Sequence, residues 1–219
     1  MATDPLREEL NKLALALEPH DIELIVGGGF GLVLRTEEIR LNNRRTRFQN
    51  PPGVRSTSDI DLFLRAEIVT DNNKMRLIRS TFDDLGYMKV KGAEYYQFVL
   101  PIEYAGFPRG IKVDLLAAPV SGPRSAEVKQ DVRRIRPRGS FNRLHAHVTP
   151  EAFTVEQNTL PVDIGDASKP VTVHIPHPFS YLLLKLFALR DRIDDTEKGA
   201  YHAFDIYRTI AMMTSEEWD

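Results

Sequence analysis

The stretch Ser58-Asp59-Ile60-Asp61-Leu62-Phe63-Leu64 decides how this chain is read, because it places two carboxylates inside an apolar run typical of a strand. Side chains two positions apart in a strand lie on the same face, about 6.5 Å apart. Two carboxylates about 5 Å apart repel by roughly 3 kcal/mol at an effective dielectric near 20. The pattern therefore predicts that Asp59 and Asp61 share a cation, and Mg²⁺ is the oxygen-preferring choice. An exposed edge strand with two solvated acids is the alternative.

A glycine run precedes the aspartate pair. Gly27-Gly28-Gly29-Phe30-Gly31 follows an apolar segment at 22–26, which predicts a strand, and precedes a predicted helix at 32–39. Glycines permit a sharp turn and a close approach of the backbone. The N–H groups of such a loop at a helix start can bind phosphate oxygens.

A third aspartate, Asp114, lies in a later predicted strand at 110–116, which follows another predicted strand at 95–100. Brought beside the pair, Asp114 would add a third carboxylate to the metal site. The alternative is that Asp114 is an ion-pair partner of Lys112 or of an arginine. Hydrophobic periodicity predicts helices at 6–17 and 74–85.

The C-terminal part is predicted to contain a strand at 171–175 and two helices at 179–189 and 200–213. The first of these helices follows Pro178, which is favoured in a first helical turn. It is apolar on almost every side except for Lys185. A lysine in such a helix commonly extends along the core surface so that its ammonium group reaches water, which is the alternative to a role in a binding site. Asp205 in the second helix could pair with Arg208 three residues later.

Basic residues gather in two segments, and such segments beside an acidic metal site suit a polyphosphate or RNA substrate. Solvated loops are the alternative explanation. The first segment contains Arg35, Arg40, Arg44, Arg45, Arg47 and Arg55. The second contains Arg124, Lys129, Arg133, Arg134, Arg136, Arg138 and Arg143.

Composition is that of an ordinary globular protein with a substantial core: 219 residues, 42% hydrophobic, 27% charged and a net charge of −2. Cysteine is absent, so disulfides and cysteine-ligated zinc are excluded. We expect a cytoplasmic location without membrane association, because the sequence has neither an apolar signal core at the N-terminus nor a run of 18 apolar residues. We also expect the natural chain to extend beyond Asp219, because Thr214-Ser215-Glu216-Glu217 is a capping box with little helix after it. A single frayed terminal turn is the alternative.

The order of these motifs resembles the nucleotidyltransferase superfamily, which has the polymerase-beta-like fold. The resemblance rests on Gly27-Gly28-Gly29, Ser58-Asp59-Ile60-Asp61 and Val113-Asp114-Leu115-Leu116. Among the branches, the chain most resembles the AbiEii/AbiGii-type toxin nucleotidyltransferases. That resemblance spans about residues 22–210 and adds the segments Arg55-Ser56-Thr57-Ser58, Lys185-Leu186-Phe187-Ala188-Leu189-Arg190 and Phe204-Asp205-Ile206-Tyr207.

The resemblance implies an α/β (α+β) fold, with a small mixed sheet flanked by helices and a mostly helical C-terminal part. We expect a nucleotidyltransferase core at 1–140, a basic insert at about 40–57, and a C-terminal part at 141–219 that is mainly helical and truncated. The glycine loop departs from the family pattern, which commonly has Ser or Thr where this chain has Gly29.

The implied site residues fall into three groups. The catalytic, metal-ligating residues are Asp59, Asp61 and Asp114. The nucleotide-binding residues are Gly27, Gly28, Gly29, Ser58, Lys185, Arg190 and Asp205. The nucleic-acid-binding residues, in the basic insert, are Arg44, Arg45 and Arg47. Arg192 and Lys198 are weaker candidates for the same site.

The implied activity is Mg²⁺-dependent transfer of an NMP from an NTP to a hydroxyl of RNA, such as tRNA, or of a protein. The resemblance further implies a toxin or phage-defence role with a cognate antitoxin as partner. Two alternatives stay open. One is an antibiotic-type transferase with a small-molecule acceptor, against which the arginine-rich insert argues. The other is a degenerate member that binds nucleotide or RNA without turnover.

Overall fold

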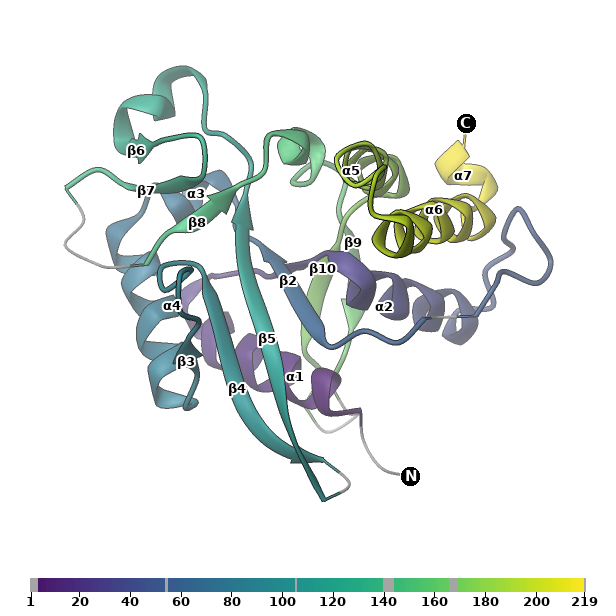
Figure 1. Ribbon diagram of the computed structural model, residues 1–219, viewed down its shortest axis with the longest axis horizontal. Coiled ribbons are helices and arrows are strands. Elements are labelled where there is room, and N and C mark those ends of the chain that lie inside the picture. Colours follow the sequence, from purple (N-terminus) through teal and green to yellow (C-terminus); the bar gives the residue numbers. More distant parts are fainter. Residues whose placement is uncertain (1–3, 54, 105, 140–143, 166–168, 219) are drawn as a thin grey trace.

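A single mixed sheet forms the centre of the molecule (Figure 1). The structure is a computed structural model that describes residues 4–53, 55–104, 106–139, 144–165 and 169–218. In this part of the chain, ten strands pair in the order β6-β7-β8-β5-β2-β1-β10-β9, with β4 beside β5 and β3 beside β4. The predicted mixed sheet flanked by helices is confirmed.

The elements alternate along the chain, with most strands in its middle. The strands are β1 (Ile25–Val26), β2 (Asp59–Phe63), β3 (Met88–Lys89), β4 (Gln97–Tyr104), β5 (Phe107–Ala117), β6 (Val128–Gln130), β7 (Arg134–Pro137), β8 (Ala146–Val148), β9 (Leu160–Asp163) and β10 (Thr172–Ile175). The α-helices are α1 (Pro5–Leu17), α2 (Gly28–Leu41), α3 (Ala66–Val69), α4 (Asn72–Asp84), α5 (Pro178–Arg190), α6 (Thr196–Ala211) and α7 (Ser215–Trp218). Short 3₁₀ helices occupy Glu18–His20, Gly122–Glu127 and Pro150–Thr154.

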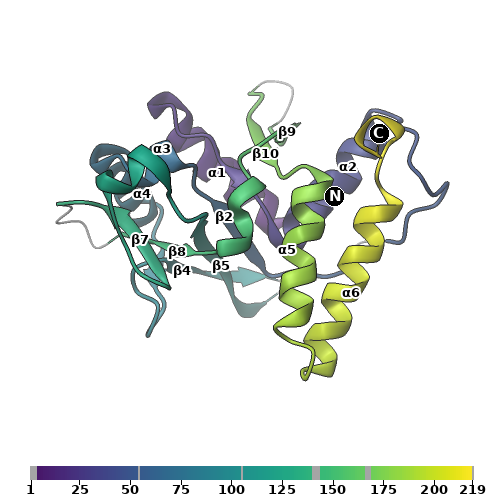
Figure 2. The same cartoon turned by 90° about the horizontal axis from the view of Figure 1, so that it is seen from above.

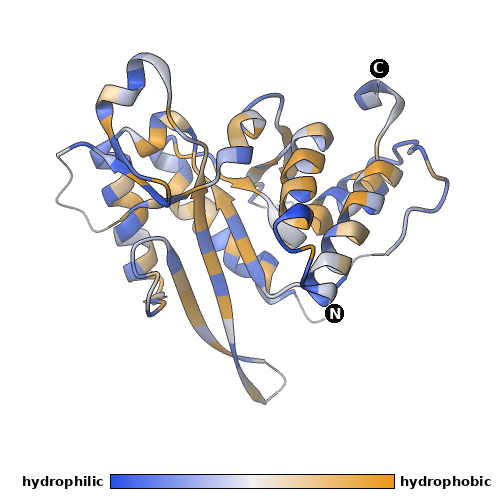
Figure 3. Ribbon diagram, turned by 45° about the horizontal axis from the view of Figure 1, so that its top comes forward, coloured by the Kyte–Doolittle hydropathy of each residue, from blue (hydrophilic) through white to orange (hydrophobic). Residues whose placement is uncertain are grey.

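The two faces of the sheet are covered by different helices (Figure 2). Ile60 and Leu62 of β2 are buried in the main core together with the apolar residues of α1 and α4. Helices α5 and α6 lie on the opposite side, where Leu184 packs near Phe63. Figure 3 shows apolar segments along α5, as its nearly all-apolar sequence predicts. No helix among the described residues has the length and apolar character needed to cross a bilayer.

Helix starts are fixed by local capping. Asp4 and Asp71 accept hydrogen bonds from first-turn N–H groups of α1 and α4, and Asp195 does the same for α6. These aspartates satisfy donors that have no intrahelical acceptor. Helix α2 differs, because it begins at Gly28 after Gly27, which has no side chain to cap it. The glycine run is thus the first turn of α2, four residues before the predicted start.

The predicted boundary between the core and the C-terminal part, at residue 140, does not divide the sheet, because strands from both sides of it pair with each other. Strand β8 pairs with β5, and β10 pairs with β1, so strands from 146–175 extend both sides of the central sheet. The mainly helical segment starts at Pro178. Strand β1 has two residues where five were predicted, because β2 and β10 pair with it only around Ile25 and Val26.

Strands β4 and β5 extend beyond the rest of the sheet as a two-stranded arm (Figure 1). Strand β2 pairs with β5 only from Lys112 to Leu116, so the part of β5 before Lys112 has β4 as its only partner among the described strands. Residues at the far end of β5 are exposed, as Phe107 shows with 70% of its surface accessible.

The predicted basic insert is an irregular segment that lies against the end of the chain. Thr46 forms an isolated bridge with Thr214, and the N–H of Arg47 donates to the carbonyl of Met213 at 2.8 Å. One of the two hydrogen bonds of the predicted capping box is also present, since the N–H of Thr214 donates to Glu217 Oε2 at 2.8 Å. The insert and α7 therefore stabilise each other.

Candidate active site

Three aspartates lie on one face of two adjacent strands. Asp61 of β2 and Asp114 of β5 are direct partners in the parallel register, and Asp59 is two residues before Asp61 on the same face. Gln97 of β4 is the partner of Asp114 on the other side of β5. The fold thus forms the row of carboxylates that the sequence predicts; their metal role stays a prediction.

The carboxylate row is only partly neutralised. Lys112 Nζ lies 3.1 Å from Asp114 Oδ2, which realises the predicted alternative for this residue. Asp114 Oδ1 is buried and has no hydrogen-bond partner. Burial and the neighbouring Asp114 raise the pKa of Asp61 to about 6, and burial also raises the pKa of Asp114. The negative charge of the row is therefore not fully compensated, and an additional cation would stabilise it.

The glycine loop packs directly on this row. Gly28 has φ +61°, and a Cβ at this position would lie 1.8 Å from Asp61 Oδ2. The N–H of Gly27 donates to the main-chain carbonyl of Asp61 at 2.8 Å. Only glycine at position 28 lets the start of α2 approach the carboxylate so closely.

A threonine hydroxyl lies beside the position where the family pattern has Ser or Thr. A Cβ on Gly29 would lie 3.0 Å from Thr57 Oγ1. Thr57 lines the same cavity as Gly28 and Gly29. A hydroxyl is thus present next to the start of α2, although it comes from the segment before β2 and not from the loop itself.

A cavity of about 690 Å³ lies above the carboxylates, within the size range of small-molecule sites. Its floor is formed by the aspartate row with Lys112 and Gln97. The opposite wall comes from α5 and α6 and contains Lys185, Arg192, Lys198, Tyr201 and His202. The cavity thus has an acidic floor and a largely basic wall.

Lys185 is held in this wall by a buried ion pair. Its Nζ lies 2.8 Å from Asp205 Oδ2, and Arg55 binds the same carboxylate at 3.0 Å. Asp205 is fully buried. Burial opposes its ionisation, but the hydrogen bonds from Arg55 and Lys185 outweigh burial and keep the pKa of Asp205 below its usual value. Lys185 therefore does not extend to bulk solvent, and Asp205 pairs with it and not with Arg208.

Several predicted nucleotide-binding residues lie outside the cavity lining. Ser58 is exposed and donates to Asp59 Oδ1 at 3.0 Å. Arg190 is exposed and pairs with Asp191 at 2.9 Å, because the turn of α5 that carries it points away from the sheet. Gly27 contributes a main-chain hydrogen bond to the carbonyl of Asp61. Asp205 forms an ion pair with Lys185 and does not itself line the cavity. Arg192 and Lys198, the weaker candidates, do line the cavity.

The predicted nucleic-acid-binding arginines also lie away from the cavity lining. Arg44 pairs with Glu38, and the guanidinium of Arg47 lies 4.0 Å from the ring centroid of Trp218. Arg44 and Arg45 line a separate shallow pocket with the start of α7. Sequence proximity to the aspartate pair gave no information about this placement, because the insert packs against residues more than 160 positions away.

Other cavity residues were not identified from sequence. Gln97 and His147 reach the site through the pairing of β4 and β8 with β5, and Tyr96 precedes β4. No local motif marks them. Arg55 and Thr57 carry a signal, because both belong to the segment Arg55-Ser56-Thr57-Ser58 that supported the resemblance.

The donors fit a hard divalent cation in chemistry, although the side chains are not assembled around one. Among the described residues, no three acidic or histidine side chains converge on a metal position as they stand. The Lys112 ammonium against Asp114 contributes to this. Three carboxylates, one of which (Asp114) has a buried oxygen without a hydrogen-bond partner, are nevertheless the kind of oxygen donors that Mg²⁺ prefers.

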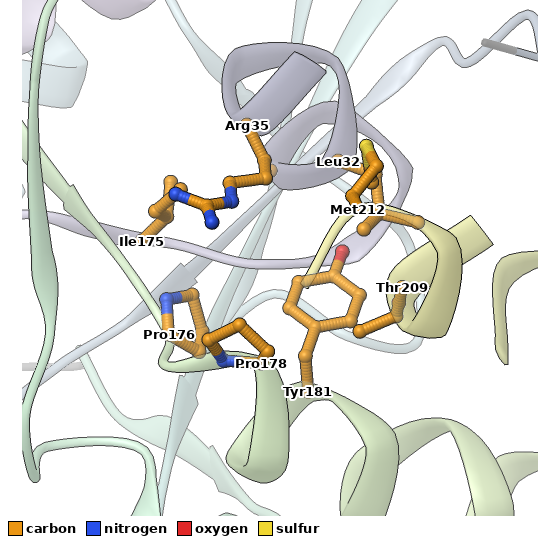
Figure 4. Close-up of a pocket in the computed structure, with 9 residues that line it drawn as sticks. Leu32, Arg35, Ile175, Pro176, Pro178, Tyr181, Thr209 and Met212 are labelled. Carbon is orange, nitrogen blue, oxygen red and sulfur yellow. The ribbon is translucent and has the colours of Figure 1, made fainter. Parts of the chain in front are cut away.

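A second, much smaller cavity lies between α2, α5 and α6 (Figure 4). It holds about 10 Å³, room for roughly one water molecule. The side chains of Leu32, Met212 and Tyr181 surround it, and the buried Tyr181 hydroxyl has no hydrogen-bond partner. This cavity is a packing gap beneath the active-site wall and is too small for a nucleotide.

Comparisons with known proteins agree with this architecture. No protein-family model matches the chain, and no curated protein matches it significantly. It is similar to the crystal structure of an antigenic nucleotidyltransferase-like protein from Paracoccidioides brasiliensis, with a TM-score of 0.53 and 16% sequence identity, covering 95% of this chain and 77% of that chain. The fold is nucleotidyltransferase-like.

At 16% sequence identity, the structural similarity concerns the arrangement of the helices and strands alone. The superfamily resemblance seen in the motifs is thereby supported at the level of fold. The finer AbiEii/AbiGii-type resemblance rests on the sequence motifs alone.

Proposed function

We propose that this protein is a divalent-cation-dependent nucleotidyltransferase that moves an NMP from an NTP to a hydroxyl, with pyrophosphate leaving. One observation carries the proposal: Asp59, Asp61 and Asp114 lie in a row that faces Lys185 across one cavity. Phosphoryl-group transfer depends mainly on positioning and on neutralising charge. A site with carboxylates on one wall and cations on the other can do both.

The start of α2 and the basic wall would hold the phosphates. The first N–H groups of a helix have no intrahelical acceptor and attract anions. Those of Gly28 and Gly29 border the cavity, beside the Thr57 hydroxyl. Lys185 and Arg55 would approach from the other side.

The carboxylates would hold Mg²⁺. When bound, the ion would supply charge neutralisation on the phosphates and polarise the reacting phosphoryl group. Asp114 lines the cavity and, with a pKa raised by burial, is the carboxylate that would accept the proton of the attacking hydroxyl.

The acceptor we propose is RNA, with protein as the competing acceptor. The support is the second basic segment, which contains Lys129, Arg134 and Arg136. Arg44 and Arg47 of the first segment, by contrast, lie away from the cavity lining. A toxin or phage-defence role with an antitoxin partner follows from the sequence resemblance only and is proposed on that basis.

Nucleotide binding without turnover is a second candidate, and one contact favours it. Lys112 already places a cation 3.1 Å from Asp114 Oδ2. In a protein that only binds nucleotide, this ammonium would stay in place and no metal would be needed.

The test is incubation with each α-³²P-labelled NTP, Mg²⁺ and total RNA, beside Asp59→Ala/Asp61→Ala. We expect label in RNA that is lost in this variant and lost when EDTA is added. Label in protein bands would redirect the acceptor to protein. If no label is transferred but nucleotides still raise the melting temperature, the binding-only candidate is favoured.

A further inference from the structure

The face of the sheet that carries the aspartates continues past the cavity to a basic edge. Leu116 of β5 is the partner of His147 of β8, and His147 is the partner of Arg134 of β7. Leu116 is two residues after Asp114, so all these side chains share the face of the carboxylates. With strands about 4.8 Å apart, Arg134 lies two strands, or about 10 Å, from the carboxylate strand.

Two aromatic pairs occupy the middle of this face. Tyr96 and His147 line the cavity, with ring centroids 5.1 Å apart. Tyr95 and His145 come next and are stacked, with centroids 4.6 Å apart and planes 10° from parallel. Burial lowers the pKa of both histidines, that of His145 to about 4, so the His145 ring is uncharged near neutral pH.

The outer end of the face is strongly positive. Residues 127–138 contain five basic residues and two acidic ones, Glu127 and Asp131. Arg134 has one of these acids, Asp131, at 3.4 Å, and its guanidinium also lies 5.6 Å from the Tyr95 ring centroid. The hairpin of β6 and β7 therefore keeps a net positive charge beside the aromatic pairs.

We propose that this face is the track of a single-stranded RNA acceptor whose 3′-hydroxyl reaches the carboxylate row. The proposal rests on the proposed function and names its acceptor path. Neutral aromatic rings next to arginines are the combination that binds single-stranded nucleic acid, since bases stack on the rings and phosphates bind the cations. The order of these groups gives the direction of the RNA strand. Its phosphates would bind Arg134 and Arg136, its bases would stack on Tyr95 and Tyr96, and its 3′ end would lie at Asp114.

This track replaces the basic insert as the preferred RNA surface. Arg44 and Arg47 pack against Glu38 and Trp218, and Arg44 and Arg45 line a pocket beside the start of α7 that shares no residue with the cavity holding the aspartates. The track, by contrast, is continuous with the cavity through His147 and Tyr96. A protein acceptor would have no particular need for stacked rings along the approach.

The experiment measures the fluorescence anisotropy of a 5′-fluorescein single-stranded RNA of about 12 nucleotides with the full chain. We expect Arg134→Ala/Arg136→Ala to weaken binding roughly ten-fold and to reduce the slope of log K against log salt by about 1.4, since each phosphate contact on a single strand contributes about 0.7. Tyr95→Ala should weaken binding about five-fold or more. Arg134→Lys/Arg136→Lys should retain most affinity, which would exclude misfolding as the cause.

Matched controls separate the track from general positive charge. Arg40→Ala/Arg76→Ala removes two exposed arginines from α2 and α4, outside the track, and should leave RNA affinity within about two-fold of the unmodified protein. If Arg44→Ala/Arg45→Ala/Arg47→Ala weakens RNA binding more than Arg134→Ala/Arg136→Ala does, the track is wrong and the insert is the RNA surface.

Label transfer in the same variants separates failure of the track from failure of the proposed function. Unchanged RNA affinity in Arg134→Ala/Arg136→Ala, with label still transferred to RNA, would overturn the track and leave the function intact. Weakened RNA affinity without transfer from any NTP would support the track and overturn the function. Label found only in protein bands, with no RNA affinity, would overturn the track and the RNA acceptor together.

Discussion

The carboxylate row and the buried cluster around Asp205 differ in how far their negative charge is compensated by neighbouring cations. In the row, Lys112 pairs with Asp114, the second oxygen of Asp114 is buried without a hydrogen-bond partner, and the pKa of Asp61 rises to about 6. In the cluster, a single fully buried carboxylate has two cations, Lys185 and Arg55, and a lowered pKa. The first arrangement is electrostatically incomplete and the second is complete.

The difference separates a surface for ligands from a structural joint. A set of like charges that lacks partners is unfavourable unless a ligand completes it. A buried carboxylate with two partners instead ties segments together, here α5, α6 and the chain before β2. The two regions meet at Lys185, which belongs to the joint and also borders the cavity.

The largest effect is expected from breaking the joint. Asp205→Ala leaves two cations without their carboxylate, and loss of one partner of a buried pair costs about 3–5 kcal/mol. We expect the free energy of unfolding in urea to fall by this amount. Asp194→Ala, at an exposed position before α6, is the control and should change it by less than about 0.5 kcal/mol. A small effect of Asp205→Ala would mean that the joint is not structural.

The next largest loss of stability is expected when a side chain is placed between the start of α2 and the carboxylate row. In Gly28→Ala the left-handed backbone costs about 1–2 kcal/mol, and the contact with Asp61 adds about 1–3 kcal/mol of overpacking. Gly86→Ala is the matched control, because its φ is +82° but its nearest contact is an ordinary 3.9 Å. The difference in melting temperature between the two variants measures the contact with Asp61; equal melting temperatures would show that this contact is unimportant.

The incomplete row should gain stability when it loses a charge. Asp61→Asn removes a carboxylate whose ionised form is disfavoured by burial and by Asp114. At pH 7.5 in EDTA we expect unfolding to require about 1–3 kcal/mol more, at 1.36 kcal/mol per unit of pKa shift. In a separate assay with Mg²⁺ we expect nucleotidyl transfer to be abolished. Asp84→Asn, at an exposed site, should alter neither property. A destabilised Asp61→Asn would show that the row is structural after all.

The smallest effect concerns pH. Burial and the charges of Lys185 and Arg192 lower the pKa of His202 to about 4. Between about pH 6.5 and 4 the unfolded chain therefore binds a proton that the folded chain does not, so stability falls as the pH falls. His202→Gln should flatten this dependence by about 1 kcal/mol, less than the full shift because the ring is partly exposed. His20→Gln, at an exposed position, is the control; equal pH profiles for both would contradict the assignment.

Local patterns were sufficient for the acidic floor of the site. A two-residue period in an apolar run determines which face Asp59 and Asp61 share, and the strand that carries Asp114 was predicted in the same way. Their mutual register depends on long-range pairing, yet parallel pairing of two such strands brings the carboxylates together in the predicted manner.

Residues brought in by non-local contacts could not be predicted. Gln97 and His147 join the floor through β4 and β8, and no motif marks either. The motif predicts Arg190 as a site residue, but Arg190 lies on the exposed side of α5, and Arg192, in the turn that follows α5, lines the cavity. The helical period alone does not say which side of an apolar helix meets the sheet.

The two-stranded arm of β4 and β5 has a consequence for behaviour at high concentration. Among the described strands, residues 100–104 of β4 and 107–111 of β5 pair only with each other, and such unpaired outer edges invite pairing with other chains. Pro101 and Pro108 lie within this arm and have no N–H to donate to an incoming strand. The arm therefore carries its own protection against edge-to-edge aggregation.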